Sequence, residues 1–361
     1  MNTPSATLRR GGGGAARVLA LIVVLLAGAG AVVFVVVAAV DGGGRTIRGA
    51  GHRPVALDFR PLLERSGAYA LSDADGVGPA AAAGIRFTLT TFRGPHAPLT
   101  AALAAHGMSL LDSYPEHALY RSECPEGRGS CAPLSAAARG RLLGDISRHV
   151  QAARSDPTVS GYYLSDDYYA DFRSELADVY RTIRQLDRTK PTVCGIELPL
   201  AYTPAHHSAP VIDRTVFAQA SVNYSPRWCN AVLIYAYGPF TASLFGSTVE
   251  WDMSSTLPQA LALLRAKGWD SATQPLIGTP QAFGYAPAVA NGRRPQFVRA
   301  PTAAQLATQV AAFCRFGARS ILAYAWRDGA RGNVTELSSS PVLRSGLAAG
   351  VRVCRARFWT P

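Results

Sequence analysis

Short apolar runs alternate with amphipathic segments along the chain from residue 67 onward. The runs are rich in β-branched and aromatic residues, which is typical of strands buried on both faces, and the segments between them have helical spacing. This alternation predicts a parallel sheet built from βα units. The predicted strands are residues 68–72, 85–92, 108–114, 159–164, 192–198, 231–237, 276–283 and 321–326.

Helices are predicted between these strands, at residues 98–106, 135–154, 170–187, 256–267 and 302–316, with a less regular segment that begins at a proline at 341–353. Eight such strands match an α/β fold of the closed (β/α)8 TIM barrel type, whose usual size of ~250 residues fits in this chain. We expect one barrel domain over residues 67–361. Between Leu198 and Cys229 only 212–220 has helical spacing, so we expect loops there.

The start of the chain has a different pattern. Residues 18–40 contain no charged or polar side chain, and a helix of that length reaches ~34 Å, enough to cross a bilayer. Residues 1–17 carry Arg9, Arg10 and Arg17 but no acid, which favours a cytoplasmic basic tail. We expect a transmembrane helix at 18–40, a Gly-rich linker at 41–66 and an extracytoplasmic barrel held at the cell membrane by a single pass. The alternative is a cleaved signal peptide, whose apolar region is usually shorter, about 7–15 residues.

The net charge of +12 narrows the choice of partners. Of the 36 basic residues only Lys190 and Lys267 are lysines, and no basic block is interleaved with aromatic residues. We therefore predict no nucleic-acid partner. An anionic glycan or an anionic membrane surface is compatible with the charge.

Six cysteines on an exported chain are consistent with three disulfides. Cys124 and Cys131 lie in a Gly/Pro-rich loop and would close a short ring, so we predict that they pair. The other four are either disulfide-bonded or buried free thiols, and a bond between Cys314 and Cys354 would join neighbouring helices; these four are Cys194, Cys229, Cys314 and Cys354.

Acids and aromatic residues collect at the carboxyl ends of the predicted strands. In order along the chain they are Asp73 and Asp75, Asp112 with Tyr114 and Glu116, Asp166 and Asp167, Glu197, Tyr235 and Tyr237, Gln281 with Tyr285, and Trp326 with Asp328. In a barrel the loops after the strands converge on one site. Carboxylates with aromatic rings suit sugar chemistry, in which one group protonates the leaving oxygen and another activates water or attacks carbon.

Four segments carry a family resemblance. Residues 161–167 (GYYLSDD) resemble the "G-W/Y-Y-L-x-D-E-P" fourth strand of (β/α)8 glycoside-hydrolase-like proteins, and 234–239 (IYAYGP) resemble their sixth-strand "Y-x-Y-P" end. Residues 280–284 (PQAFG) are similar to the seventh-strand "Q-A-F-G", and 317–326 (GARSILAYAW) to the eighth-strand segment in which a Trp floors the sugar site. The resemblance implies a barrel of the glycosidase superfamily that acts on carbohydrate.

The chain departs from this family at two places. Retaining enzymes of the superfamily usually end the fourth strand in Asn-Glu and take a Glu nucleophile from the seventh, whereas this chain has Asp166-Asp167 and Gln281 there. An amide cannot be a carboxylate nucleophile, which leaves an inverting pair or no hydrolysis. We predict Asp167 as the acid and Asp166 in a supporting role, with Glu197 and Asp112 as further catalytic candidates. The predicted substrate-binding residues are Tyr114, Tyr235, Tyr237, Gln281, Tyr285, Trp326 and Asp328.

Structural roles compete with these assignments. Asp166 or Asp167 would cap the helix that follows, Glu197 would be a solvated loop acid, and Asp112 would pair with an Arg. For the whole protein the alternative is an inactive barrel that binds a glycan or acts as a scaffold in the cell envelope. The histidines lack a third spaced ligand, and nucleotide, dehydrogenase, serine-hydrolase and zinc-protease motifs are missing, so no metal or cofactor is expected.

Overall fold

The computed structural model describes residues 56–126, 131–166, 170–198, 200–201, 211–212, 214–237, 242–244, 247–249, 253–285, 300–327 and 334–359. They belong to one compact unit, Val55–Pro361. The predicted tail, the transmembrane segment 18–40 and most of the linker lie outside these residues. Among the described helices, none has both the length and the apolar character needed to cross a membrane.

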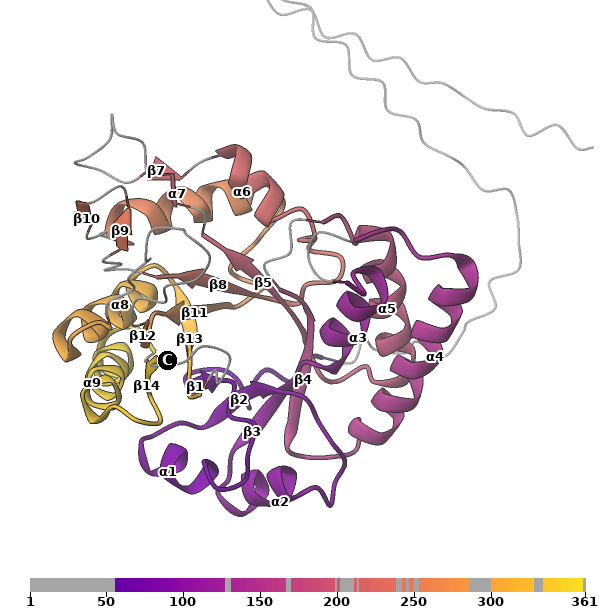
Figure 1. Ribbon diagram of the computed structural model, residues 1–361, viewed down its shortest axis with the longest axis horizontal. Coiled ribbons are helices and arrows are strands. Elements are labelled where there is room, and N and C mark those ends of the chain that lie inside the picture. Colours follow the sequence, from indigo (N-terminus) through magenta and orange to yellow (C-terminus); the bar gives the residue numbers. More distant parts are fainter. Residues whose placement is uncertain are drawn as a thin grey trace, which may run out of the picture. The chain divides into compact units, whose positions relative to one another are not determined.

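Eight parallel strands close into a barrel (Figure 1), which confirms the predicted fold. Its closure is the pairing of the first strand with the last, in which Ser66 lies opposite Ile321 and Ala68 opposite Ala323. In chain order the barrel strands are β1 (Ser66–Tyr69), β2 (Phe87–Thr90), β3 (Ser109–Asp112), β4 (Val159–Ser165), β5 (Thr192–Glu197), β8 (Ala231–Ala236), β11 (Leu276–Pro280) and β13 (Ala318–Ala323).

The last barrel strand begins three residues earlier than its apolar run predicts. Arg319 and Ser320 interrupt the apolar pattern, but Ser320 is fully buried and its hydroxyl donates to the carbonyl of Leu62. A partner inside the protein makes burial of the hydroxyl tolerable. Sequence hydropathy alone therefore placed this strand too late.

Helices surround the barrel (Figure 1). They are α1 (Val77–Ala82), α2 (Pro98–Ala105), α3 (Tyr114–Glu123), α4 (Ala136–Ala153), α5 (Arg173–Leu186), α6 (Arg214–Ala220), α7 (Met253–Ala266), α8 (Ala303–Arg315) and α9 (Pro341–Arg357). Within the described parts of the connections lie three two-stranded antiparallel sheets: β6 (Leu200–Ala201) with β7 (Val211–Ile212), β9 (Ala242–Leu244) with β10 (Ser247–Val249), and β12 (Phe283–Tyr285) with β14 (Val334–Glu336).

The last helix is regular, although the sequence predicted an irregular segment there. Gly346 and Gly350 lower its intrinsic helix propensity. Both glycines face α8: a Cβ at Gly346 would meet the backbone of Ala303, and one at Gly350 would meet Val310. Close packing of α9 on α8 therefore outweighs the propensity cost, and the Cys314–Cys354 disulfide joins the same two helices.

Two apolar clusters divide the core. One lies between the barrel wall and the helices. The other fills the barrel interior with Leu62, Phe87, Leu89, Leu111, Tyr163, Val193, Ala231, Leu233, Tyr235, Ile277 and Leu322. The barrel is therefore a packed core rather than a pore, and its chemistry is confined to one end.

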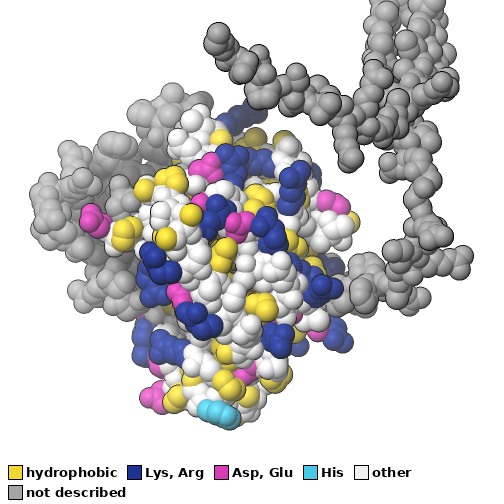
Figure 2. All heavy atoms as spheres, turned by 90° about the vertical axis from the view of Figure 1, so that its right-hand side faces the viewer, with side chains coloured by type: hydrophobic (Ala, Val, Ile, Leu, Met, Phe, Trp, Pro, Cys, Tyr) yellow, Lys and Arg dark blue, Asp and Glu magenta, His cyan; other side chains and the backbone are white. Residues whose placement is uncertain are grey.

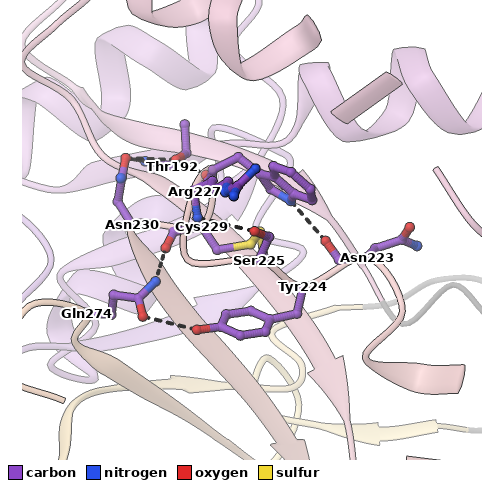
Figure 3. The surroundings of a disulfide bond; sticks show 10 residues. Thr192, Asn223, Tyr224, Ser225, Arg227, Cys229, Asn230 and Gln274 are labelled. Atoms are coloured by element: carbon purple, nitrogen blue, oxygen red, sulfur yellow. Dashed lines mark hydrogen bonds between the residues drawn. A yellow bond between two sulfur atoms is a disulfide. The ribbon is translucent and has the colours of Figure 1, made fainter. Parts of the chain in front are cut away.

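All six cysteines are paired, and the predicted bond between Cys124 and Cys131 is confirmed. Figure 3 shows the surroundings of Cys229, which is bonded to Cys194 of β5. The Gln274 amide donates to the Cys229 carbonyl and accepts from the Tyr224 hydroxyl at 3.0 Å. These contacts fix the amino ends of β5 and β8, opposite to the ends at which the acids are placed.

The basic residues are spread over the surface. On the face seen in Figure 2, Lys and Arg side chains are interspersed with Asp, Glu and apolar ones. Several are neutralised locally, as in the ion pairs of Arg173 with Asp171 and of Arg181 with Asp178. The positive net charge is therefore scattered on this face, as the sequence predicted.

Candidate active site

Asp166 is the centre of a polar cluster at the carboxyl end of the barrel. It directly follows β4, and its Oδ1 accepts a hydrogen bond from the hydroxyl of Tyr163 at 2.9 Å. Its Oδ2 accepts from the hydroxyl of Tyr69, at the end of β1, at 3.3 Å. Asp166 does not cap the next helix, because α5 begins at Arg173 and has no side-chain cap. The capping interpretation of Asp166 is therefore wrong.

A second tyrosine extends this hydrogen-bond chain. The hydroxyls of Tyr163 and Tyr235 are 2.9 Å apart. Because the single hydrogen of Tyr163 is used toward Asp166, Tyr235 is the donor in this pair. Burial raises the pKa of both tyrosines well above the usual value, and the charge of Asp166 raises it further. The two phenols keep their hydrogens, and a directed chain runs from Tyr235 through Tyr163 to Asp166.

A glycine makes room for this arrangement. Gly195 on β5 lies against Tyr163 and Tyr235, and a Cβ at this position would overlap the Tyr163 hydroxyl and lie 3.1 Å from the Tyr235 ring. Any larger residue would push Tyr163 away from Asp166. Because Gly195 of β5 has no side chain, the ring of Tyr163 on β4 has room to reach Asp166.

Aromatic rings surround the same end of the barrel. The rings of Tyr69 and Tyr324 are 4.9 Å apart, and Tyr237 contacts Phe283 edge-on at 5.1 Å. Phe283 and Tyr324 are in turn 5.4 Å apart. Tyr69, Tyr237 and Tyr324 are half-buried. Rings with polar tips next to a carboxylate are suited to contact a ligand that is itself both apolar and polar.

Asp112 occupies a different environment from Asp166. It is fully buried, and its Oδ1 accepts from the backbone amides of Phe92 and Tyr114 at 3.0 and 3.1 Å. Its Oδ2 is 2.6 Å from Nε2 of His149 on α4, so its partner is a histidine and not the expected arginine. The Tyr114 ring stacks on His149 at 3.9 Å. Asp112 and Tyr114 therefore join β2, β3 and α4.

The structure places the remaining predicted site residues in several settings. Glu197 is the last residue of β5, half-buried and opposite Tyr235 in register. Gln281 is fully buried, and its amide donates to the carbonyl of Phe283 at 3.1 Å. Trp326 is only 2% exposed and belongs to the cluster between barrel and helices, away from the barrel interior.

The other predicted residues have no described side chain. Tyr285 lies on β12 opposite Val334, and nothing further is stated of its side chain. Asp167 and Asp328 lie outside the described residues. Among the described residues no group of three or more His, Cys, Asp or Glu side chains is placed to hold a metal ion.

Sequence reasoning missed Tyr69, Tyr163, Tyr324 and His149. Tyr69 and Tyr324 could have been identified by their position at the end of a strand, because the candidate acids were identified in the same way. Alternation along β4 indicated that either Tyr162 or Tyr163 faces inward, but not which. His149 carried no signal, because it lies in the middle of an amphipathic helix.

No protein-family model matches the chain, and no curated protein matches it in sequence. Among solved structures it is similar to the "Polyextremophilic Beta-galactosidase from the Antarctic haloarchaeon Halorubrum lacusprofundi", with a TM-score of 0.47, 12% identity, and coverage of 81% of this chain and 57% of that one. It is also similar to Ruminococcus gnavus beta-glucuronidase, with a TM-score of 0.48, 11% identity, and coverage of 83% and 50%. A third is the GH2 beta-galacturonidase from Eisenbergiella tayi bound to galacturonate, with a TM-score of 0.48, 11% identity, and coverage of 82% and 51%. The chain thus spans about half the length of these proteins.

Proposed function

We propose that the carboxyl end of the barrel binds a carbohydrate and hydrolyses a glycosidic bond, with Asp166 as one of the two acting carboxylates. The observation that carries the proposal is the hydrogen-bonded chain from Tyr235 through Tyr163 to Asp166, with Tyr69 on the other carboxylate oxygen. Two hydroxyl donors hold both oxygens of one acid in place at the end of a strand. This is how a barrel orients a group for chemistry.

The proposed roles follow from the hydrogen bonds. A carboxylate that accepts hydrogen bonds on both oxygens is suited to take a proton from water or to stabilise positive charge, and less suited to donate a proton. We assign that role to Asp166. The acid that protonates the leaving oxygen is proposed to be Asp167, the next residue, with Glu197 at the neighbouring strand end as the further candidate. In this inverting scheme the base removes a proton from water as the oxygen of that water attacks the anomeric carbon.

The test is release of reducing ends from a panel of cell-wall and plant glycans. Wild type is compared with Asp166→Asn and Asp167→Asn, and with Asp171→Asn as a matched control, because Asp171 is an exposed acid that pairs with Arg173. We expect the two site variants to lose ~10²–10⁴-fold in turnover, with melting temperatures close to wild type. If wild type binds a glycan but cleaves none, and the site variants bind it equally well, hydrolysis is ruled out.

A second candidate function is glycan binding without hydrolysis, and the ring contacts of Tyr237 and Tyr324 favour it. Under this interpretation Tyr237→Ala weakens binding of a glycan that Asp166→Asn still binds. Under the hydrolytic interpretation Asp166→Asn stops turnover whether or not binding changes. Calorimetry and the reducing-end assay on the same variants separate the two.

We further propose that the barrel lies outside the cytoplasm and is held at the membrane by residues 18–40. Three disulfides support an oxidising compartment, and the uncharged run supports the anchor. Protease added to intact cells should digest the barrel, and a membrane fraction should retain the protein after a high-salt wash. Release of a barrel that lacks residues 1–40 would indicate a cleaved signal peptide instead.

A further inference from the structure

A second polar cluster lies at the ends of β2 and β3, and the proposed hydrolysis at Asp166 does not use it. Thr91 follows β2, and Ser113 follows β3 immediately before α3. His117, in the first turns of α3, brings its Nδ1 to 3.3 Å from the Thr91 hydroxyl and to 3.5 Å from the Ser113 hydroxyl. On the other side of the ring, Nε2 is 3.3 Å from Oε2 of Glu116. In space, the imidazole of His117 therefore lies between the Thr91 hydroxyl and the Glu116 carboxylate.

The negative charge of Glu116 favours one position for the imidazole proton of His117. A hydrogen on Nε2 lies within ion-pair distance of the negative charge of Glu116, and this tautomer leaves the lone pair of Nδ1 facing the hydroxyls. Glu116 is only 2% exposed, whereas His117 is exposed. A buried carboxylate that orients an imidazole, whose second nitrogen faces a hydroxyl, is the arrangement that activates a nucleophile in acyl transfer.

The ring is suited to act as a base. Desolvation lowers the pKa of His117 and the charge of Arg121 lowers it further, while Asp166 and Asp112 oppose this shift. The net direction is downward, which favours the neutral imidazole that a base requires. A neutral imidazole within hydrogen-bond distance of a hydroxyl accepts the proton of that hydroxyl when its oxygen attacks.

Of the two hydroxyls, Thr91 is the better nucleophile. It is the closer one to Nδ1 and is half-buried, whereas Ser113 is only 3% exposed. The Ser113 hydroxyl is 3.0 Å from that of Thr91 and so helps to hold it. A nucleophile needs access to the substrate, which Ser113 lacks. We propose that Thr91, His117 and Glu116 form a nucleophilic relay that hydrolyses esters of small carboxylic acids.

The reaction proceeds in two halves. The Thr91 oxygen bonds to the acyl carbon as its proton passes to Nδ1 of His117, and the alcohol leaves with that proton when the ester C–O bond breaks. Water then attacks the acyl group on Thr91 and gives a proton to Nδ1. That proton returns to the Thr91 oxygen as the acid departs. The sum is ester plus water to alcohol plus acid, with Glu116 as a positioning residue that stabilises the imidazolium.

The test uses the full chain and 4-nitrophenyl acetate. We expect saturable hydrolysis by wild type and a loss of ~10²–10⁴-fold in kcat for Thr91→Ala and His117→Gln, with partial activity retained by Thr91→Ser. Glu116→Gln should lower the midpoint of the pH–rate profile, because an imidazolium without its carboxylate loses its proton more readily. His106→Gln, at an exposed histidine at the end of α2, is the matched control for hydrolysis by surface imidazoles.

Acid-quenched wild type gives the second readout. Peptide mass mapping should find the acetyl group on Thr91. Acetyl on Ser113 or on no residue, or an unsaturable rate that His106→Gln lowers as much as His117→Gln does, would overturn the proposal. Cleavage of glycans is measured in a separate assay. A negative esterase result therefore leaves the proposal for Asp166 unaffected, and a negative glycan result leaves the esterase proposal unaffected.

Discussion

Tyr162 and Tyr163 are neighbours on β4, yet their hydroxyls bind carboxylates on opposite sides of the barrel wall. Tyr162 donates to Oδ2 of Asp187, at the end of α5, at 3.0 Å. Tyr163 donates to Oδ1 of Asp166 at 2.9 Å. Successive side chains on a strand point to opposite faces. One tyrosine therefore ties a helix to the barrel, and the other orients the acid of the candidate site.

Replacing each tyrosine by phenylalanine should separate these roles. Tyr163→Phe removes a donor from Asp166 and the acceptor of Tyr235, so we expect turnover or binding of the glycan to fall, together with a loss of about 1 kcal/mol in unfolding free energy. Tyr162→Phe should cost a similar amount of stability but leave the glycan assay unchanged, because Asp187 still accepts from Thr189. Urea unfolding and the glycan assay on both variants test this. Equal effects of the two variants on the glycan assay would contradict it.

The space beside Tyr163 gives a second prediction. In Gly195→Ala the new Cβ overlaps the Tyr163 hydroxyl, so the ring must move and its bond to Asp166 must lengthen. Crowding of this kind costs about 1–3 kcal/mol, and we expect activity to fall with stability. Gly140→Ala is the control: nothing lies within 4 Å of its Cβ in α4, and removing a helical glycine should stabilise by about 0.5–1 kcal/mol. Full activity in Gly195→Ala would show that the tyrosine chain is dispensable.

The barrel could be predicted from the sequence because its strands are buried on both faces and so form separate apolar runs. The sequence predictions were wrong for two helices, α3 and α9. The helix α3 was missed because its first residue, Tyr114, continues the apolar run of β3, and the regularity of α9 was missed because Gly346 and Gly350 serve its packing on α8. The packing of the two glycines on α8 is not local in sequence, whereas Tyr114 gave a local signal that was misleading.

The place of Asp166 at the end of a strand was predictable, but its hydrogen-bond partners were not. Asp166 was found from its place after an apolar run. Tyr69 lies 97 residues away from it and reaches it only because the barrel closes. The partner of Asp112 likewise lies on α4 and is a histidine, whereas charge alone favoured an arginine. The sequence pattern shows where a strand ends. Which side chains come into contact at that end depends on how the barrel closes.

The disulfides should differ in their contribution to stability. Cys314–Cys354 closes a segment of 40 residues between α8 and α9, and Cys124–Cys131 closes one of 7. Loop closure in the unfolded chain costs more for the longer segment, so the double Cys→Ser change at 314 and 354 should lower the unfolding free energy by about 2–4 kcal/mol and the change at 124 and 131 by less. Denaturant unfolding of both double variants measures the difference. A larger loss for the short ring would contradict this account.

A buried acid away from the candidate site should make stability depend on pH. Glu123 on α3 is only 3% exposed, and its pKa is raised to about 7, chiefly by burial and also by the charge of Glu175, with Arg139 opposing the shift. Because the folded pKa is above the unfolded value, the folded state holds the extra proton, and this contribution to stability is lost as pH rises from about 4.5 to about 7. Glu123→Gln stays neutral, so it should be more stable than wild type by on the order of 2 kcal/mol at pH 8 and about equal to it at pH 4.5. Unfolding curves between these pH values measure the difference, with Glu126→Gln, at an exposed neighbour, as the control. A constant difference between Glu123→Gln and wild type across this range would show that Glu123 does not titrate there.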